Sequence, residues 1–204
     1  MTHSVLHVAA PVQPAYVALP KGRVVVIRPA EPSDTAAVAV LHSRCGPRTL
    51  HDRYLSPPPR ITSTTLRALV SPPGGCALAA VTKAGDIVGL IQISGGEEPG
   101  AADLALMVRD DFQRVGLGSL LARHGIRSAV AMGFDEVTSC GVASNIRLVR
   151  MLGRLGLGPY LRTADGYVHL RVPLAEAVVA AGLDRRTIDL TESARETAGA
   201  EPAA

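Results

Sequence analysis

Apolar residues recur along this chain in two patterns, short β-branched runs and stripes with helical spacing. Runs of about four to eight apolar residues between Gly, Pro and Asp predict strands. The stripe Leu148, Met151, Leu152 and Leu155 follows i, i+3, i+4, i+7, which predicts a helix face packed in the core. The expected strands are residues 24–27, 76–82, 87–94, 103–108, 137–142 and 167–172. The expected helices are residues 35–41, 64–70, 145–155 and a long segment that ends near residue 132.

The order of these elements predicts one mixed sheet. The early strands are joined by hairpin signals such as Ala84-Gly85-Asp86, and a strand–helix–strand–helix unit follows them. We therefore expect a single domain of the α/β (α+β) class. Its sheet is expected to be twisted and mostly antiparallel, with six to seven strands and helices on both faces. Pro57-Pro58-Pro59 is expected to exclude a helix from residues 46–60.

Composition divides the 204 residues into a body and two less regular ends. Residues 1–22 are rich in Pro, Ala and Val and are expected to form an extended arm that orders only if it docks. Residues 23–174 are expected to form the domain, and residues 175–204 a C-terminal helix and flexible tail. Membrane association is not expected, because no apolar stretch approaches the roughly 18 residues of a span. A signal peptide is not expected either, because the first residues lack a basic segment.

Charge and cysteine content narrow the classes of function. The net charge of +3 is too weak and scattered to predict nucleic-acid binding, and the chain has no Trp to stack on bases. Three cysteines far apart, Cys45, Cys76 and Cys140, exclude a disulfide framework and a CxxC zinc site, so no metal is expected. We expect a cytoplasmic protein that is a monomer or a dimer.

The segment that follows the strand at 103–108 carries the most specific chemistry. Gly116 and Gly118 stand in a short loop at the start of a helix, where no Cβ blocks a ligand. Free backbone N–H groups of the loop and helix start form a cradle for phosphate or pyrophosphate. The spacing is neither that of a Walker loop nor that of a GxGxxG turn. A tight turn that needs glycine only for packing is the alternative.

The loop resembles the acetyl-CoA pyrophosphate loop of the GNAT N-acetyltransferase superfamily. The resemblance covers residues 24–173, most of the chain. Segments 102–113 and 49–54 are most similar to the catalytic domains of bacterial protein lysine acetyltransferases. The matching motifs are Gln113-x-x-Gly116-x-Gly118, Asn145 with Gly156-Leu157 eleven residues later, and Ile27-Arg28-Pro29-Ala30-x-x-Ser33-Asp34.

This resemblance implies how acetyl-CoA is held. In the family, the strand before the loop and the strand after the long helix splay apart, and the pantetheine arm lies in the gap. Here those strands are residues 103–108 and 137–142. Asn145 is implied to sit beside the cofactor, and it can also cap the following helix. The residues implied to bind acetyl-CoA are Leu106, Met107, Val108, Gln113, Arg114, Val115, Gly116, Leu117, Gly118, Ser119 and Asn145.

The resemblance also implies direct attack of an amine on the thioester. An alkylammonium must first lose a proton, and Asp103 stands where similar lysine acetyltransferases place a glutamate. Aspartate is one methylene shorter, so a water relay is expected. The alternative is that Asp103 is a solvated residue at the start of an edge strand. Leu152 occupies the position at which many members carry a tyrosine as general acid.

The acceptor is the least specified partner. His51, Arg53 and Tyr54 stand where the family often contacts the acceptor, although a surface loop is the alternative. A protein lysine is the first expectation and a small-molecule amine the second. Acceptor choice is expected to depend on loops 44–63 and 158–167. A non-catalytic module that binds acyl-CoA and regulates a partner is the competing class.

Overall fold

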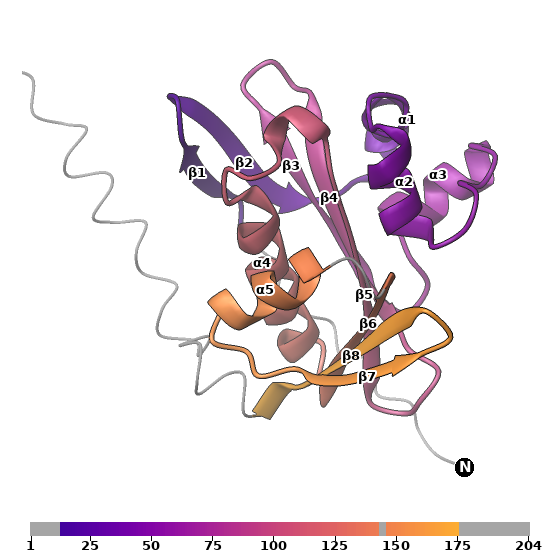
Figure 1. Ribbon diagram of the computed structural model, residues 1–204. Coiled ribbons are helices and arrows are strands. Elements are labelled where there is room, and N and C mark those ends of the chain that lie inside the picture. Colours follow the sequence, from indigo (N-terminus) through magenta and orange to yellow (C-terminus); the bar gives the residue numbers. More distant parts are fainter. Residues whose placement is uncertain (1–12, 143–145, 176–204) are drawn as a thin grey trace, which may run out of the picture.

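The computed structural model describes residues 13–142 and 146–175, and their strands form one sheet in the order β1-β2-β3-β4-β5-β6-β8-β7 (Figure 1). All neighbouring strands are antiparallel except β5 and β6. The strands are β1 (Ala15–Leu19), β2 (Arg23–Pro29), β3 (Cys76–Thr82), β4 (Ile87–Gly95), β5 (Ala101–Val108), β6 (Glu136–Val142), β7 (Tyr160–Ala164) and β8 (Tyr167–Pro173). The helices are α1 (Thr35–Ser43), α2 (Pro47–Tyr54), α3 (Ser63–Val70), α4 (Leu117–Ala131) and α5 (Ile146–Arg154), with short 3₁₀ turns η1 (Pro32–Asp34) and η2 (Asp110–Phe112).

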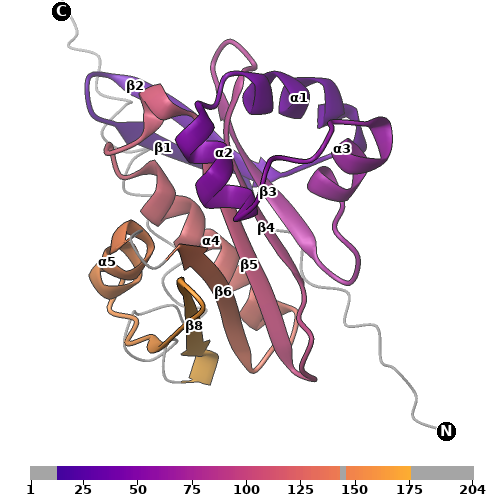
Figure 2. The same ribbon diagram turned by 45° about the vertical axis from the view of Figure 1, so that its right-hand side comes forward.

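Helices cover both faces of the sheet (Figures 1 and 2). Successive residues of a strand point to opposite faces, so the core divides into two clusters. Leu90 of β4 packs in the cluster that contains α1 and α3, whereas Ile91 packs in the cluster that contains α4 and α5. Gly125 of α4 brings this helix close to the sheet, because a Cβ there would lie 2.7 Å from Cδ1 of Ile91. This architecture confirms the predicted mixed sheet with helices on both faces.

The sheet has eight strands rather than the six or seven expected, because two edge strands were not predicted. Strand β1 lies within the segment expected to be an arm, where it pairs with β2. Strand β7 lies within the expected loop 158–167 and is almost wholly exposed, so it carries no hydrophobic alternation. Residues 1–12, Asn145 and most of the expected tail lie outside the described residues.

Helix α2 corrects the expectation that prolines keep residues 46–60 free of helix. Pro47 occupies the first turn of α2, where its missing N–H has no partner to lose. Leu55 ends the helix in the left-handed region with φ 57°. Pro57 therefore prevents only a continuation of the helix, and residues 47–54 remain helical.

Strands β5 and β6 part soon after they meet. Their pairing covers only Ala101↔Glu136, Ala102↔Val137 and Asp103↔Thr138, although both strands continue beyond these residues. Strand β6 instead pairs along its whole length with β8. The predicted splay of a central strand pair is therefore present, and it opens just after Asp103. No helix within the described ranges is long and apolar enough to cross a membrane.

Candidate acetyl-CoA and acceptor site

The backbone of β5 presents an unpaired edge to the opening. The N–H of Arg109 donates to the Val88 carbonyl on the β4 side at 2.9 Å, so odd-numbered residues of β5 face β4. The Leu104 carbonyl faces β6 and accepts from Oγ of Ser139 at 2.8 Å. Because the pattern repeats every two residues, Leu106 also faces the opening, beyond the last pair with β6. Its N–H and carbonyl are positioned to pair with an amide of a ligand.

The loop before α4 is open in the manner expected of a phosphate cradle. Gly116 is the N-cap of α4 and has φ 90°, and a Cβ built there meets no atom within 4 Å. Gly118 faces the opening, because its Cβ would lie 3.7 Å from Cδ2 of Leu106 and from Sδ of Met151. The first turn of α4 carries no acidic residue that would repel an anion. The residues present fit a pyrophosphate at this helix start.

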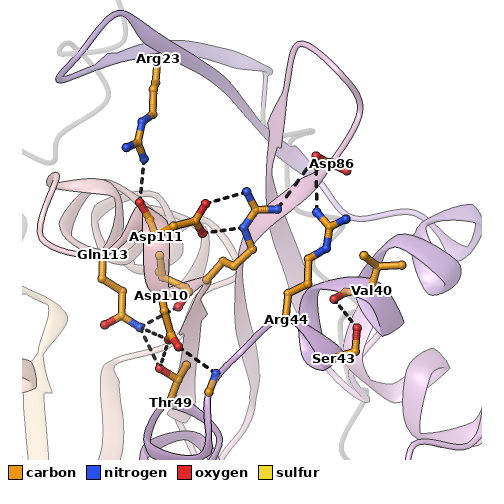
Figure 3. Close-up of polar contacts among 12 residues, drawn as sticks. Arg23, Val40, Ser43, Arg44, Thr49, Asp86, Asp110, Asp111 and Gln113 are labelled. Carbon is orange, nitrogen blue, oxygen red and sulfur yellow. Dashed lines mark hydrogen bonds and ion pairs between the residues drawn. The ribbon is translucent and has the colours of Figure 1, made fainter.

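A polar network fastens this loop to helix α2 (Figure 3). Nε2 of Gln113 donates to the Val108 carbonyl at 2.9 Å, to Oγ1 of Thr49 at 2.9 Å and to Oδ1 of Asp110 at 3.0 Å. The other oxygen of Asp110 accepts from the N–H of Gly46, the N-cap of α2, at 2.9 Å. The side-chain nitrogen of Gln113 is therefore engaged within the protein, where it holds the loop between β5 and α2.

The remaining residues expected to bind acetyl-CoA differ in exposure. Met107 and Val108 are buried, so only their backbone can meet a ligand. Leu117 is also buried, beneath the loop. Leu106, Val115, Gly118 and Ser119 are half-buried, and Arg114 and Gly116 are exposed.

A cavity of about 270 Å³ lies where β5 and β6 part. A second hollow of about 880 Å³ runs outward between the β4–β5 turn and the β7–β8 hairpin. Asp103, Ser139 and Cys140 line both, so Asp103 stands at their junction. The small cavity is lined by Asp52, Arg53, Tyr54, Leu55, Asp103, Leu104, Ala105, Leu106, Ser139, Cys140, Leu148 and Met151.

The environment of Asp103 suits a base. Asp103 is exposed, yet partial desolvation by the surrounding protein raises the pKa of its carboxyl, while the charge of Arg53 and the backbone N–H of Leu104 act in the opposite direction. The side chain still reaches solvent through the large hollow. A carboxyl with a raised pKa removes a proton from an alkylammonium more effectively than an ordinary aspartate does.

Arg53 and Tyr54 reach the small cavity, whereas His51 lies exposed on α2 and lines neither hollow. The guanidinium of Arg53 donates to Oε1 of Gln92 and lies 5.1 Å from the centroid of the Tyr54 ring. Burial lowers the pKa of Arg53, against the charges of Tyr54 and Asp103. The structure thus brings two of the three residues expected at the acceptor site together with Asp103.

Several lining residues were not identified from the sequence. Leu148 and Met151 were expected to be core, but they are only partly buried and line the cavity, whereas Leu152 and Leu155 are buried as expected. Gln92 supports Arg53, and its Nε2 donates to the Ala68 carbonyl at 3.0 Å. A polar residue within the apolar run of β4 was the signal that could have revealed it.

Among the tyrosines of the described residues, Tyr54 lines the inner cavity, and its buried hydroxyl has no hydrogen-bond partner within these residues. Leu152 is buried in the core. Tyr160 is exposed and lines only the outer hollow. The hydroxyl of Tyr167 donates to the Leu55 carbonyl at 3.3 Å, and Tyr167 lines neither hollow.

Comparison with known proteins assigns the family. Residues 37–157 match the model of the acetyltransferase (GNAT) family, which is more than half of the chain. The protein belongs to the GNAT acetyltransferase family and is an acyltransferase. Membership implies transfer of an acetyl group from acetyl-CoA.

Individual relatives agree with this assignment. Acetyltransferase PA5475 of Pseudomonas aeruginosa is 30% identical over 132 residues, which are 62% of this chain and 71% of that protein. The GNAT domain of S. lividans PAT superposes with a TM-score of 0.69 at 20% identity, and the match covers 78% of this chain and 95% of the S. lividans domain. A phosphinothricin acetyltransferase from Sinorhizobium meliloti in complex with AcCoA has a TM-score of 0.61 at 14% identity, and the match covers 73% of this chain and 88% of the S. meliloti chain. The two structures share the fold with this chain.

Proposed function

We propose that this protein is an acetyl-CoA-dependent N-acetyltransferase in which a primary amine attacks the thioester directly and Asp103 acts as the base. The observation that carries this proposal is the position of Asp103. It stands at the junction of the two hollows, at the last residue before β5 and β6 part. An amine that enters through the outer hollow meets the carboxyl where the inner cavity begins.

The chain provides two anchors for the co-substrate. The unpaired edge at Leu106 pairs with the pantetheine arm, and the loop from Gln113 to Ser119 holds the pyrophosphate through backbone N–H groups. The thioester supplies an activated acetyl group. Asp103 takes one proton from the acceptor ammonium, directly or through one water, and the neutral amine then forms the N–C bond as the C–S bond breaks. Leu152 occupies the position at which many members carry a tyrosine, and the second nitrogen proton passes to the leaving CoA thiolate.

Two kinds of acceptor follow from different observations. The similarity of segments 49–54 and 102–113 to lysine acetyltransferases supports a protein lysine. The outer hollow of about 880 Å³, through which the amine enters, supports a small amine, since its volume lies within the roughly 300–1,000 Å³ of drug-sized sites. In both cases the amine itself reacts beside Asp103.

A reducing compartment is part of the proposal. Cys45, Cys76 and Cys140 are all free thiols. Burial raises the pKa of Cys45 to about 12, with a further contribution from the charge of Asp110, so this thiol stays protonated and unreactive at neutral pH. Such cysteine usage is typical of a cytoplasmic enzyme.

Thermal denaturation with and without acetyl-CoA tests the proposal, with ATP as control. Acetyl-CoA at about 100 times its Kd adds roughly 2.7 kcal/mol to the free energy of unfolding. We expect CoA compounds to stabilise the protein and ATP not to do so. Thiol release is then measured with a panel of lysine peptides and small amines, and Asp103→Ala is expected to bind acetyl-CoA but to lose turnover. Absence of stabilisation at millimolar acetyl-CoA contradicts the proposal, and binding without turnover for every acceptor indicates the regulatory module instead.

A further inference from the structure

Two opposite charges line the inner cavity without forming an ion pair. Arg53 enters from helix α2 and Asp103 from strand β5. The Arg53 charge acts on the carboxyl of Asp103, yet the ion pairs within the described residues do not include these two side chains. The cavity therefore offers a cation and an anion that are separated from each other.

Arg53 has hydrogen-bonding capacity that the described residues leave unused. A guanidinium has five N–H donors, and among these residues Gln92 is its hydrogen-bond acceptor. Gln92 is buried and its own amide nitrogen is held by the Ala68 carbonyl, which fixes its oxygen toward Arg53. A neutral amide oxygen does not balance the charge of a half-buried guanidinium, and the Tyr54 ring and the charge of Asp103 do not outweigh its desolvation. A carboxylate is the group that matches the planar fork of arginine.

We propose that the acceptor is an amino acid, whose carboxylate binds Arg53 while its amine reacts beside Asp103. This inference rests on the proposed function and names its substrate class. Asp103 takes one proton from the ammonium, the neutral amine nitrogen forms a bond to the acetyl carbon, the C–S bond breaks, and the second nitrogen proton passes to the leaving thiolate, so that CoA departs as the thiol. The product is an N-acetyl amino acid whose carboxylate stays on Arg53.

The arrangement favours the acceptor over the acyl chain as the source of the carboxylate. Asp103 lies in the same cavity as Arg53, and the group that must lose its proton at Asp103 belongs to the acceptor. A zwitterion presents an ammonium and a carboxylate close together, which complements the separated charges of the cavity. The side chain of a lysine within a protein carries no carboxylate next to its reacting amine, so a protein lysine leaves Arg53 without a hydrogen-bonded carboxylate.

Matched acceptor pairs test this inference. Each proteinogenic amino acid is compared with its carboxamide and with the amine that lacks the carboxyl group, and a lysine peptide is included. Release of CoA is followed by mass spectrometry, which the three cysteines of the protein do not disturb. We expect an amino acid to exceed its carboxamide by roughly 10- to 150-fold in kcat/KM, the range of hydrogen bonds to charged groups.

Variants of Arg53 connect the preference to this residue. Arg53→Gln is expected to remove the preference for the carboxylate, and Arg53→Lys to retain part of it, while the Kd for acetyl-CoA measured by calorimetry stays unchanged. Arg67→Gln on the exposed surface of α3 is the matched control and keeps the preference. The melting temperature of each variant shows whether it is folded.

The outcomes separate the two proposals. If the unaltered protein does not bind acetyl-CoA, the proposed function itself is refuted. Binding of acetyl-CoA together with equal use of amino acids and their carboxamides, or a preference for the lysine peptide, overturns the amino-acid acceptor alone. If a dicarboxylic acyl-CoA reacts with neutral amines and Arg53→Gln abolishes this, the anion belongs to the acyl chain and the inference is wrong. Failure of every amino acid to stabilise the CoA-saturated protein or to react also overturns it.

Discussion

Gly116→Asp is the sharpest perturbation of the pyrophosphate loop. Gly116 has φ 90°, and its Cβ position is open, so a carboxylate fits without a clash and lies where phosphate oxygens are expected. Two unit charges about 4 Å apart repel by about 1 kcal/mol in water and about 4 kcal/mol near a protein surface. Because 1.4 kcal/mol is a factor of ten, the Kd for acetyl-CoA is expected to rise roughly 5- to 1,000-fold.

The same substitution also strains the backbone, and this effect needs its own control. Gly85 in the β3–β4 turn has φ 86° and an equally open Cβ position, but it lies outside the loop. Both Gly116→Asp and Gly85→Asp are expected to lose about 1–2 kcal/mol of unfolding free energy from the left-handed backbone. Calorimetric titration with acetyl-CoA distinguishes them, and Gly116→Ala separates strain from charge. If Gly116→Asp binds acetyl-CoA as tightly as Gly85→Asp does, the loop does not hold the pyrophosphate and the reasoning fails.

Three further predictions concern the base, an ion pair and a close backbone contact. Asp103→Asn lowers kcat by about 10²- to 10⁴-fold with an unchanged Kd for acetyl-CoA. In the unaltered enzyme the rate falls as the pH drops through the raised pKa of Asp103. Because the Arg53 charge lowers that pKa, Arg53→Gln is expected to move the acidic limb of the pH–rate profile to higher pH. A profile that does not move contradicts this prediction. Asp34 accepts from both terminal nitrogens of Arg28 at 2.7 and 2.8 Å, and Asp34→Asn is expected to cost about 1–3 kcal/mol in urea unfolding at neutral pH. Hydrogen bonding to Arg28 lowers the pKa of Asp34. The stabilisation by this ion pair is therefore complete above the ordinary aspartate pKa of about 4 and is lost as the pH falls through the lowered value. If the unfolding free energies of the unaltered protein and Asp34→Asn differ equally at pH ~2 and at neutral pH, the prediction is wrong. A Cβ on Gly75 would lie 1.8 Å from the Ile93 carbonyl oxygen, so Gly75→Ala is expected to lower the melting temperature. Gly153→Ala on α5 is the control, because a Cβ there meets no atom within 4 Å. Equal melting temperatures of the two variants refute the close contact.

The sequence was sufficient where local chemistry decides the structure. The β-branched and alanine run of β3 predicted its bounds, and the glycines at 116 and 118 predicted a loop that leaves its backbone accessible. The motif Ile27-Arg28-Pro29-Ala30-x-x-Ser33-Asp34 matched the family as a pattern only. The structure gives a physical reason for it, because Arg28 and Asp34 close the turn before α1 through two hydrogen bonds.

Long-range pairing was what the sequence did not reveal. Strand β7 has no buried face, so it forms because β8 lies beside it, and no local pattern marks it. The support of Arg53 by Gln92 joins residues 39 positions apart, and the network of Gln113 and Thr49 joins residues 64 apart. Such contacts depend on tertiary structure, which one sequence alone does not specify.

The short pairing between β5 and β6 has a consequence for how the domain opens. Three residue pairs connect the sheet of β1–β5 to the ribbon of β6–β8, and the shared core on the α4 side and a few side-chain hydrogen bonds add to them. Local unfolding separates such parts with less free energy than global unfolding. Backbone amides of β8 therefore exchange with solvent faster than those of β4. A molecule of acetyl-CoA that spans the opening joins the two parts and slows exchange in β8.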